Sequence, residues 1–157
     1  MESLRHLIER FDHVAYAVEM IEDALPTLDL MGASFYDGAD HVRNEFRWAQ
    51  FKLPDGSKLE YLAPLTETSF LRRYLDTRGP GMHHITLKVT NLKAAAAICE
   101  TQGFTVTGYS ESEMWSELFI HPKSANGALI QLARWDYSHT LATTIESVLA
   151  GSVIDDT

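Results

Sequence analysis

Two pairs of potential metal ligands occur in the sequence with the same order and the same spacing. His13 precedes Glu60 by 47 residues, and His84 precedes Gln131 by 47 residues, so a shift of 71 residues carries one pair onto the other. Imidazole nitrogens combined with carboxylate or carboxamide oxygens suit Zn, Co, Ni, Mn or Fe(II) better than calcium. Duplicated modules related by a pseudo-twofold axis can aim corresponding side chains at one centre. The spacing therefore predicts one divalent metal ion held by these four residues.

The alternative interpretation is that these are ordinary strand residues, with satisfied buried histidines and a solvated acid and amide. Buried polar groups cost free energy unless they are paired, so packing alone would favour Val or Ile at such positions. The symmetric placement in apolar strands therefore favours the metal site. His83 competes with its neighbour, but the shift selects His84 as the partner of His13. We expect His83 to face the other side, either packing there or supporting a metal ligand.

The same shift predicts two tandem βαβββ modules. It places Gly103 on Gly32 and Gly127 on Gly56 without a gap, and Asn91 is a suitable N-cap for the second helix. Pro26 either delays or kinks the first helix. The expected elements of the first module are strands at 11–18, 34–36, 46–53 and 58–62 with a helix at 22–32, and those of the second are strands at 82–89, 105–109, 117–121 and 128–133 with a helix at 91–103.

The remaining segments connect and close this α+β arrangement. A short helix is expected from Glu67 to Arg78, before a Gly-Pro-Gly stop. Apolar residues from Leu141 to Leu149 have helical spacing and predict a C-terminal helix lying on the domain, followed by a frayed end at 152–157. The predicted organisation is one domain, 1–157, with modules at 11–63 and 82–134, a helical connector at 64–81 and a C-terminal helix and tail at 135–157.

Composition excludes several classes of function. The 157 residues are 45% apolar and 22% charged, which is enough to bury a core, and the formal net charge of −9 opposes nucleic-acid binding. We find neither a signal peptide nor an apolar run of about 20 residues, so we expect a cytoplasmic protein without membrane contact. Cys99 is the only cysteine, so neither an intrachain disulfide nor a thiolate metal cluster is expected.

Several strings resemble the vicinal oxygen chelate superfamily, which includes glyoxalase I, extradiol dioxygenases and bleomycin-resistance proteins. They are FDHVAYAV (11–18), KLEYLAPL (58–65), GPGMHHITLKV (79–89), HPKS (121–124) and GALIQL (127–132). The resemblance covers about residues 11–134 and looks closest to the methylmalonyl-CoA epimerases. It implies a glyoxalase-like fold in which the two modules form a cupped mixed β-sheet. It also implies that the metal ligands lie at His13, Glu60, His84 and Gln131.

The chain departs from the epimerase pattern at Gln131, where the family usually has Glu. A carboxamide oxygen can bind a metal ion but cannot accept a proton from carbon. Glu60 is therefore our candidate for the catalytic base, and Glu45 and Glu117 are candidates for the second acid or base. Lys123, in the HPKS string, is a candidate for holding a substrate phosphate, although an exposed turn lysine is the ordinary alternative.

The resemblance implies a divalent-metal-dependent epimerase or isomerase that removes the proton beside a thioester carbonyl, with an acyl-CoA such as methylmalonyl-CoA as substrate. A glyoxalase I-type lyase acting on a glutathione hemithioacetal needs the same kind of site. An extradiol dioxygenase fits less well, because such relatives draw two histidines and one carboxylate from one module. A metal-free protein that binds a small molecule is the non-enzymatic alternative. The modules pair either within one chain or across a homodimer.

Overall fold

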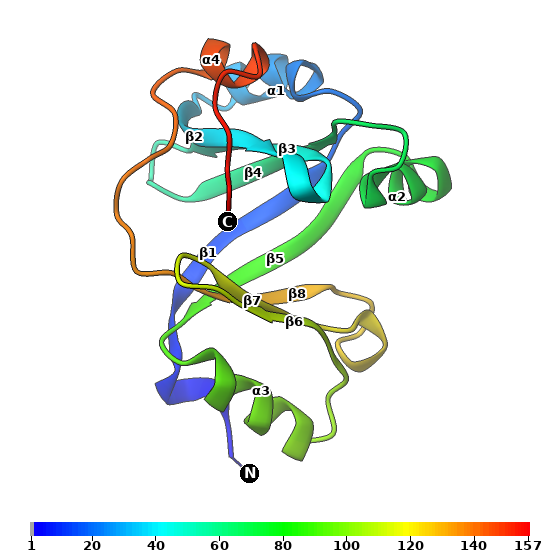
Figure 1. The fold of residues 1–157 in the computed structure, drawn as a ribbon, viewed down its shortest axis with the longest axis vertical. Helices are drawn as coiled ribbons and strands as arrows, with labels where there is room; N and C mark the ends of the chain where they lie inside the picture. The colour runs from blue at the N-terminus through cyan, green and yellow to red at the C-terminus, as the bar shows by residue number, and fades with distance from the viewer. Residues whose placement is uncertain (1) are drawn as a thin grey trace. The chain divides into compact units, whose positions relative to one another are not determined.

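The computed structural model describes residues 2–157, which form eight strands, four α-helices and four short 3₁₀ helices (Figure 1). The strands are β1 (Ile8–Ala17), β2 (Ser34–His41), β3 (Phe46–Lys52), β4 (Lys58–Pro64), β5 (Gly81–Val89), β6 (Val106–Glu111), β7 (Ser116–Ile120) and β8 (Ile130–Arg134). The α-helices are α1 (Leu25–Leu30), α2 (Phe70–Arg78), α3 (Leu92–Thr101) and α4 (Ile145–Leu149), and the 3₁₀ helices are η1 (Leu4–His6), η2 (Ile21–Ala24), η3 (Val42–Asn44) and η4 (Pro122–Ser124). None of the helices in the described part of the chain has the length and apolar character that a bilayer crossing requires.

The strands form an eight-stranded mixed sheet in the order β2-β3-β4-β1-β5-β8-β7-β6. Strand β5 pairs with β8 in parallel, whereas the hairpins β2/β3, β3/β4, β6/β7 and β7/β8 are antiparallel. Read outward from β1 and from β5, the two halves of this order correspond strand for strand. The α+β fold with a repeated βαβββ unit is therefore confirmed.

Two compact units divide the chain. Unit 1 contains the residues up to His13 and His84–Ser138, and unit 2 contains Val14–His83 and His139–Thr157. The divisions fall inside β1 and β5, so each of these strands runs from one unit into the other.

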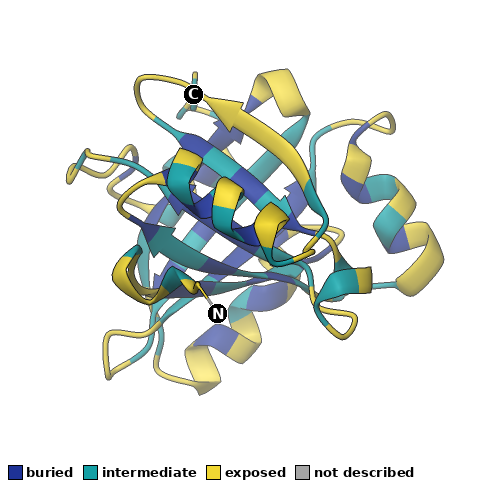
Figure 2. Cartoon of the chain, turned by 90° about the horizontal axis from the view of Figure 1, so that it is seen from below, coloured by how far each residue is buried: buried dark blue, intermediate teal, exposed yellow. Residues whose placement is uncertain are grey.

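In unit 1, helix α3 lies against β6, β7 and β8 (Figure 1). The Asn91 side chain caps its start by accepting a hydrogen bond from the Ala94 amide at 2.9 Å, as predicted. The helix buries residues at three- and four-residue spacing, and Figure 2 shows this alternation of buried and exposed residues along the helices. These buried residues join one apolar core: Val89, Leu92, Ala95, Cys99, Leu118, Ile120 and Leu132.

In unit 2, the α-helices α1 and α2 begin later than the sequence pattern suggested. Residues 21–24 form the 3₁₀ helix η2, and α1 begins at Leu25 with Pro26 in its first turn, because proline lacks the N–H that a later position would need. The connector helix α2 begins at Phe70 rather than at Glu67. Ser69 sets this start, since its hydroxyl oxygen accepts a hydrogen bond from the Leu71 amide.

The predicted C-terminal helix is present and packs on β2 of unit 2, but it is shorter than expected. Helix α4 spans only Ile145–Leu149, because Leu141 and Ala142 direct their amides to the Asp37 carboxylate instead of continuing a helix. The prediction of a frayed end was wrong. The Asp40 amide donates to the carbonyl of Val153, and the Asp155 amide donates back to the carbonyl of Asp40, each at 2.9 Å.

Candidate metal centre

Three of the four predicted ligands lie in unit 1, on three different strands. His13 is on β1, His84 on β5 and Gln131 on β8, and all three side chains are buried. The two imidazole rings are 5.9 Å apart between centroids and meet edge to face. The hydroxyl of Thr86 donates its one hydrogen to Oε1 of Gln131 at 2.6 Å, and its oxygen lies 3.0 Å from Nε2 of His13. Unit 1 therefore brings these polar groups together in a buried environment.

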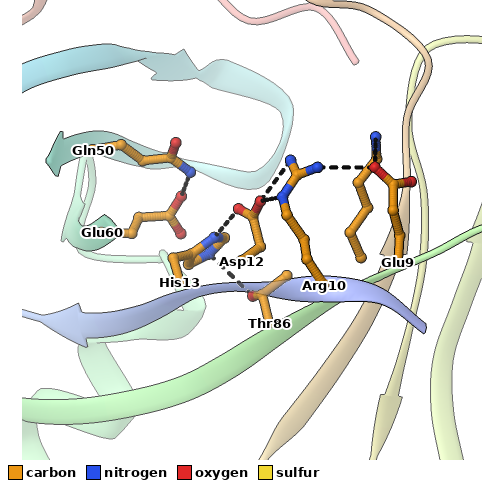
Figure 3. Close-up of polar contacts among 8 residues, drawn as sticks. Glu9, Arg10, Asp12, His13, Gln50, Glu60 and Thr86 are labelled. Atoms are coloured by element: carbon orange, nitrogen blue, oxygen red, sulfur yellow. Dashed lines mark hydrogen bonds and ion pairs between the residues drawn. The ribbon is translucent and has the colours of Figure 1, made fainter. Parts of the chain in front are cut away.

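The Asp12 carboxylate fixes the tautomer of His13. Its Oδ2 atom lies 2.8 Å from Nδ1 of the ring, and both side chains are almost completely buried (Figure 3). Because an ionised carboxylate only accepts hydrogen bonds, the ring hydrogen sits on Nδ1 and the lone pair on Nε2. Metal-binding histidines typically have this carboxylate–imidazole arrangement, which also fixes the ring orientation.

Asp12 is itself held by charged groups that lead to the surface. The Nε and Nη2 atoms of Arg10 both lie 2.9 Å from Oδ1 of Asp12, and Arg10 also contacts Glu9 (Figure 3). Lys88 reaches Glu9 at 3.2 Å. Such charge-assisted hydrogen bonds satisfy a carboxylate that would otherwise be costly to bury.

The Gln131 carboxamide is oriented by Glu117, on the neighbouring strand β7. Its Nε2 atom donates to Oε2 of Glu117 at 2.6 Å, while its oxygen accepts from Thr86. The indole Nε1 of Trp115 donates to the same Glu117 oxygen at 2.9 Å. Gln131 therefore turns its oxygen, the atom able to bind a metal, toward the side on which Thr86 contacts His13.

Unit 2 contains the fourth predicted ligand, Glu60, buried on β4. Glu60 is directly opposite Gln50 in the β3/β4 ladder, and Nε2 of Gln50 donates to Oε2 of Glu60 at 2.7 Å (Figure 3). This cross-strand hydrogen bond restrains the carboxylate without neutralising it.

His83 packs against aromatic rings of α2 in unit 2. Its ring centroid is 4.9 Å from that of Tyr74 and 6.1 Å from that of Phe70. Burial lowers the pKa of His83, and this effect outweighs the opposite influence of Glu60. These ring contacts are packing contacts, which is one of the two roles expected for His83.

The HPKS string builds a turn. The ring of His121 accepts a hydrogen bond from the Lys123 amide at 3.1 Å, and the Ser124 hydroxyl accepts one from the Thr105 amide at 2.9 Å. Lys123 is exposed at this turn, and its binding of a phosphate stays a prediction. The connection between β7 and β8 contains η4 and spans residues 121–129. It is longer than the corresponding connection between β3 and β4, which spans residues 53–57. As a result Gln131 faces Phe119, whereas Glu60 faces Gln50, so the ladders differ in register despite the ungapped sequence repeat.

The structure adds three polar residues that the sequence analysis did not select: Asp12, Thr86 and Gln50. A signal existed for one of them. Thr86 lies two positions after His84, which places these two side chains on one face of a strand. Asp12 directly precedes His13, and neighbouring strand residues normally point to opposite faces, so spacing did not indicate their contact. Gln50 has no local signal, because its contact with Glu60 depends on the hairpin register.

The donor set of unit 1 suits a borderline divalent cation. Two imidazoles and a carboxamide oxygen are ligands for Zn, Co, Ni, Mn or Fe(II), whereas a calcium site would present mainly oxygen. The fixed tautomer of His13 and the oriented amide of Gln131 present a lone pair each. The residues of this unit therefore fit a metal ion.

Comparisons with known proteins identify the family of the chain. Residues 12–116 match the family described as the Glyoxalase/Bleomycin resistance protein/Dioxygenase superfamily. An ethylmalonyl-CoA/methylmalonyl-CoA epimerase of Cereibacter sphaeroides is 32% identical over 132 residues, which cover 80% of this chain and 98% of the relative. The crystal structure of methylmalonyl-CoA epimerase from Mycobacterium tuberculosis has a TM-score of 0.75 at 27% identity, covering 87% of this chain and 94% of that one.

A fold similarity extends to a relative solved with an acyl-CoA compound. A Streptomyces coelicolor methylmalonyl-CoA epimerase in complex with 2-nitronate-propionyl-CoA has a TM-score of 0.71 at 24% identity, covering 83% of this chain and 99% of that one. Fold and sequence therefore give the same assignment. The chain belongs to the glyoxalase/bleomycin resistance protein/dioxygenase superfamily.

Proposed function

We propose that this protein is a metal-dependent epimerase that removes and returns the proton beside the carbonyl of an acyl-CoA thioester of the methylmalonyl type. The observation that carries the proposal is the buried donor set of unit 1, where the His13 and His84 rings lie 5.9 Å apart between centroids and the Gln131 oxygen accepts a hydrogen bond from Thr86. The 32% identity to an ethylmalonyl-CoA/methylmalonyl-CoA epimerase supports the choice of substrate class.

In this proposal His13, His84, Glu60 and Gln131 hold a single divalent ion. When bound, such an ion supplies positive charge that stabilises an enolate oxygen. Asp12 keeps the His13 lone pair on Nε2, and Glu117 keeps the Gln131 oxygen turned inward. The chain's own contribution is thus to fix ligand atoms before substrate arrives, which avoids reorganisation during the reaction.

Glu60 is the proposed base. The α C–H bond breaks, the proton passes to the Glu60 carboxylate, and the bonding electron pair enters the enolate. Gln50 orients the carboxylate by holding Oε2 at 2.7 Å. Gln131 cannot accept this proton, since its amide oxygen is too weak a base.

Epimerisation also requires a second group that returns a proton to the opposite face, and we propose Glu45 for it. Glu45 adopts a left-handed backbone conformation, with φ of 58°, which a non-glycine residue rarely adopts and which costs on the order of 1–3 kcal/mol. The Thr68 hydroxyl lies 2.8 and 3.0 Å from its two carboxylate oxygens. Such strain is typical of functional sites. Glu117 is less suited, because its Oε2 already receives two hydrogen bonds.

The test is exchange of the α-proton with solvent. Metal-loaded protein is incubated with methylmalonyl-CoA in D2O, and deuterium at the α-carbon is followed by mass spectrometry. We expect exchange by the wild type and a loss of about 10²-fold or more in Glu60→Gln, with metal content measured in parallel. Glu67→Gln, an exposed acid on the same unit, is the matched control and should exchange like the wild type.

Two outcomes would contradict the proposal. Fully metallated wild type that exchanges no α-proton, yet converts the methylglyoxal–glutathione hemithioacetal, would indicate a glyoxalase-type isomerase. Inactivity toward both substrates would favour a dioxygenase or a binding protein of the same superfamily.

A further inference from the structure

Glu117 and Gln131 form a diagonal pair across the β7/β8 hairpin. In this antiparallel ladder Glu117 faces Ala133 and Phe119 faces Gln131, so Glu117 and Gln131 lie two positions apart on one face of the sheet. Their side chains meet at 2.6 Å, between Nε2 of Gln131 and Oε2 of Glu117. The register of one hairpin therefore places a carboxylate directly behind a predicted metal ligand.

This contact determines which end of the carboxamide faces inward. A carboxylate only accepts hydrogen bonds, so the NH2 end must face Glu117, and the oxygen then accepts from Thr86 at 2.6 Å. The reverse orientation would bring the amide oxygen against the carboxylate oxygen, which is repulsive. Gln131 is only 6% exposed, so water offers little compensation for such a flip.

Glu117 is held in place by a second donor. The Trp115 indole donates to the same Oε2 atom at 2.9 Å, and the indole stacks on Trp135 with centroids 5.0 Å apart. Two hydrogen bonds thus fix the amide of Gln131, one from Thr86 and one to Glu117, and the Trp115 indole holds Glu117 in place. Donation of an amide N–H to a carboxylate also shifts electron density toward the amide oxygen, which makes that oxygen a stronger ligand.

We propose that Glu117 is a positioning residue that fixes Gln131 as a neutral oxygen ligand. The negative charge at this end of the site is then carried by Glu117 and not by the ligand itself. This proposal deepens the proposed function and rests on its assignment of Gln131 to the metal. Glu117 acts through Gln131 and is not itself the acid or base.

The first test removes the charge of Glu117. In Glu117→Gln the new carboxamide can donate or accept, so the orientation of Gln131 is no longer dictated. We expect metal affinity, measured by competition with a chromogenic chelator using Zn or Co, to fall about tenfold or more. Glu113→Gln makes the same charge change at an exposed position between β6 and β7 and should keep wild-type affinity.

The second test exchanges the two side chains. Gln131→Glu alone places two carboxylates at hydrogen-bond distance, and their repulsion should lower the melting temperature of the metal-free protein. In Glu117→Gln/Gln131→Glu the hydrogen bond is restored with its polarity reversed. We expect this double variant to melt above Gln131→Glu and to bind metal within a few-fold of the wild type, so the two substitutions are strongly non-additive.

A metal-independent measurement separates this inference from the proposed function. The side-chain amide protons of Gln131, observed by ¹⁵N NMR, should exchange slowly with solvent in the metal-free wild type and faster in Glu117→Gln. If neither the wild type nor any variant bound a divalent ion, the proposed function would fail. The NMR and melting data would still show whether Glu117 holds the Gln131 amide. Unchanged exchange and unchanged metal affinity in Glu117→Gln, or additive effects in the double variant, would overturn the positioning role.

Discussion

The Asp12 carboxylate lies 2.8 Å from Nδ1 of His13, the residue that follows it in the chain, and both side chains are almost fully buried. Neighbouring residues of a strand normally point to opposite faces, so the strand pattern alone did not predict this contact. The pair keeps the His13 lone pair on Nε2, on the side of the ring where Thr86 lies. A residue outside the predicted ligand set therefore determines how a ligand is presented.

Substitution of Asp12 should weaken metal binding without removing it. In Asp12→Asn the new amide can donate as well as accept, so the tautomer of His13 is no longer fixed. We expect affinity for Zn or Co to fall about tenfold, measured by chelator competition. Asp76→Asn, an exposed site on α2, is the control for charge. Equal affinities in the wild type and Asp12→Asn would mean that the carboxylate has no role in ligand presentation.

Removal of either histidine should abolish the metal centre. We expect about one divalent ion per chain in the wild type and none in His13→Ala or His84→Ala after dialysis, measured by elemental analysis. His6→Ala, at an exposed position in η1, should retain the ion. Circular dichroism would establish that the variants are folded. Unchanged metal content in both alanine variants would show that the ion binds elsewhere.

Asp37 should stabilise the C-terminal segment of unit 2. Its Oδ1 atom accepts backbone hydrogen bonds from Gly38, Leu141 and Ala142 at 2.8–2.9 Å. Asp37→Ala leaves these buried donors without a partner, so we expect the free energy of unfolding to fall by about 2–4 kcal/mol in urea titrations. Asp37→Asn keeps an oxygen at this position and should lose much less. Equal losses in the two variants would contradict the role of the acceptor.

The pH dependence of the stability of the wild type and of Asp37→Asn gives a second measurement. Burial raises the pKa of Asp37 above its ordinary value of 3.8, despite the three amide donors that oppose the shift. The folded state thus binds this proton more tightly than the unfolded state. The stabilising contribution is present below pH 3.8 and is lost as pH rises through the raised pKa. Asp37→Asn should therefore gain stability relative to the wild type as pH rises across that window. A constant difference would contradict the shift.

Gly38 should tolerate no larger side chain. A Cβ atom at this position would lie 2.7 Å from the Trp48 carbonyl oxygen and 3.1 Å from a methyl group of Val148. Because the first of these contacts is with backbone, we expect Gly38→Ala to lower the free energy of unfolding by about 1–3 kcal/mol. Gly81→Ala, where the nearest atom is 3.9 Å away, is the matched strand control and should change it by less than about 0.5 kcal/mol. Equal stability of the two variants would show that β2 can shift to accommodate a methyl group.

The sequence by itself determined the repeated βαβββ pattern, the strands that carry the candidate ligands and the cap at Asn91. These features are local or periodic: alternation marks a strand, a polar side chain before an apolar helix marks its start, and a constant shift marks a duplication. They appear without knowledge of which strands pair. The late start of α2 was missed because Ser69 and Glu67 both lie in a segment of turn-forming residues, and only the observed hydrogen bond distinguishes them.

Only the tertiary structure decided the partners of those ligands. Thr86 reaches both His13 and Gln131 because β5 lies between β1 and β8 in the sheet. Glu117 reaches Gln131 because the β7/β8 ladder pairs Phe119 with Gln131. A change of register by one residue would turn Glu117 to the opposite face. The docking of the C-terminal end on Asp40 uses backbone atoms, which every residue carries, so side-chain pattern could not reveal it.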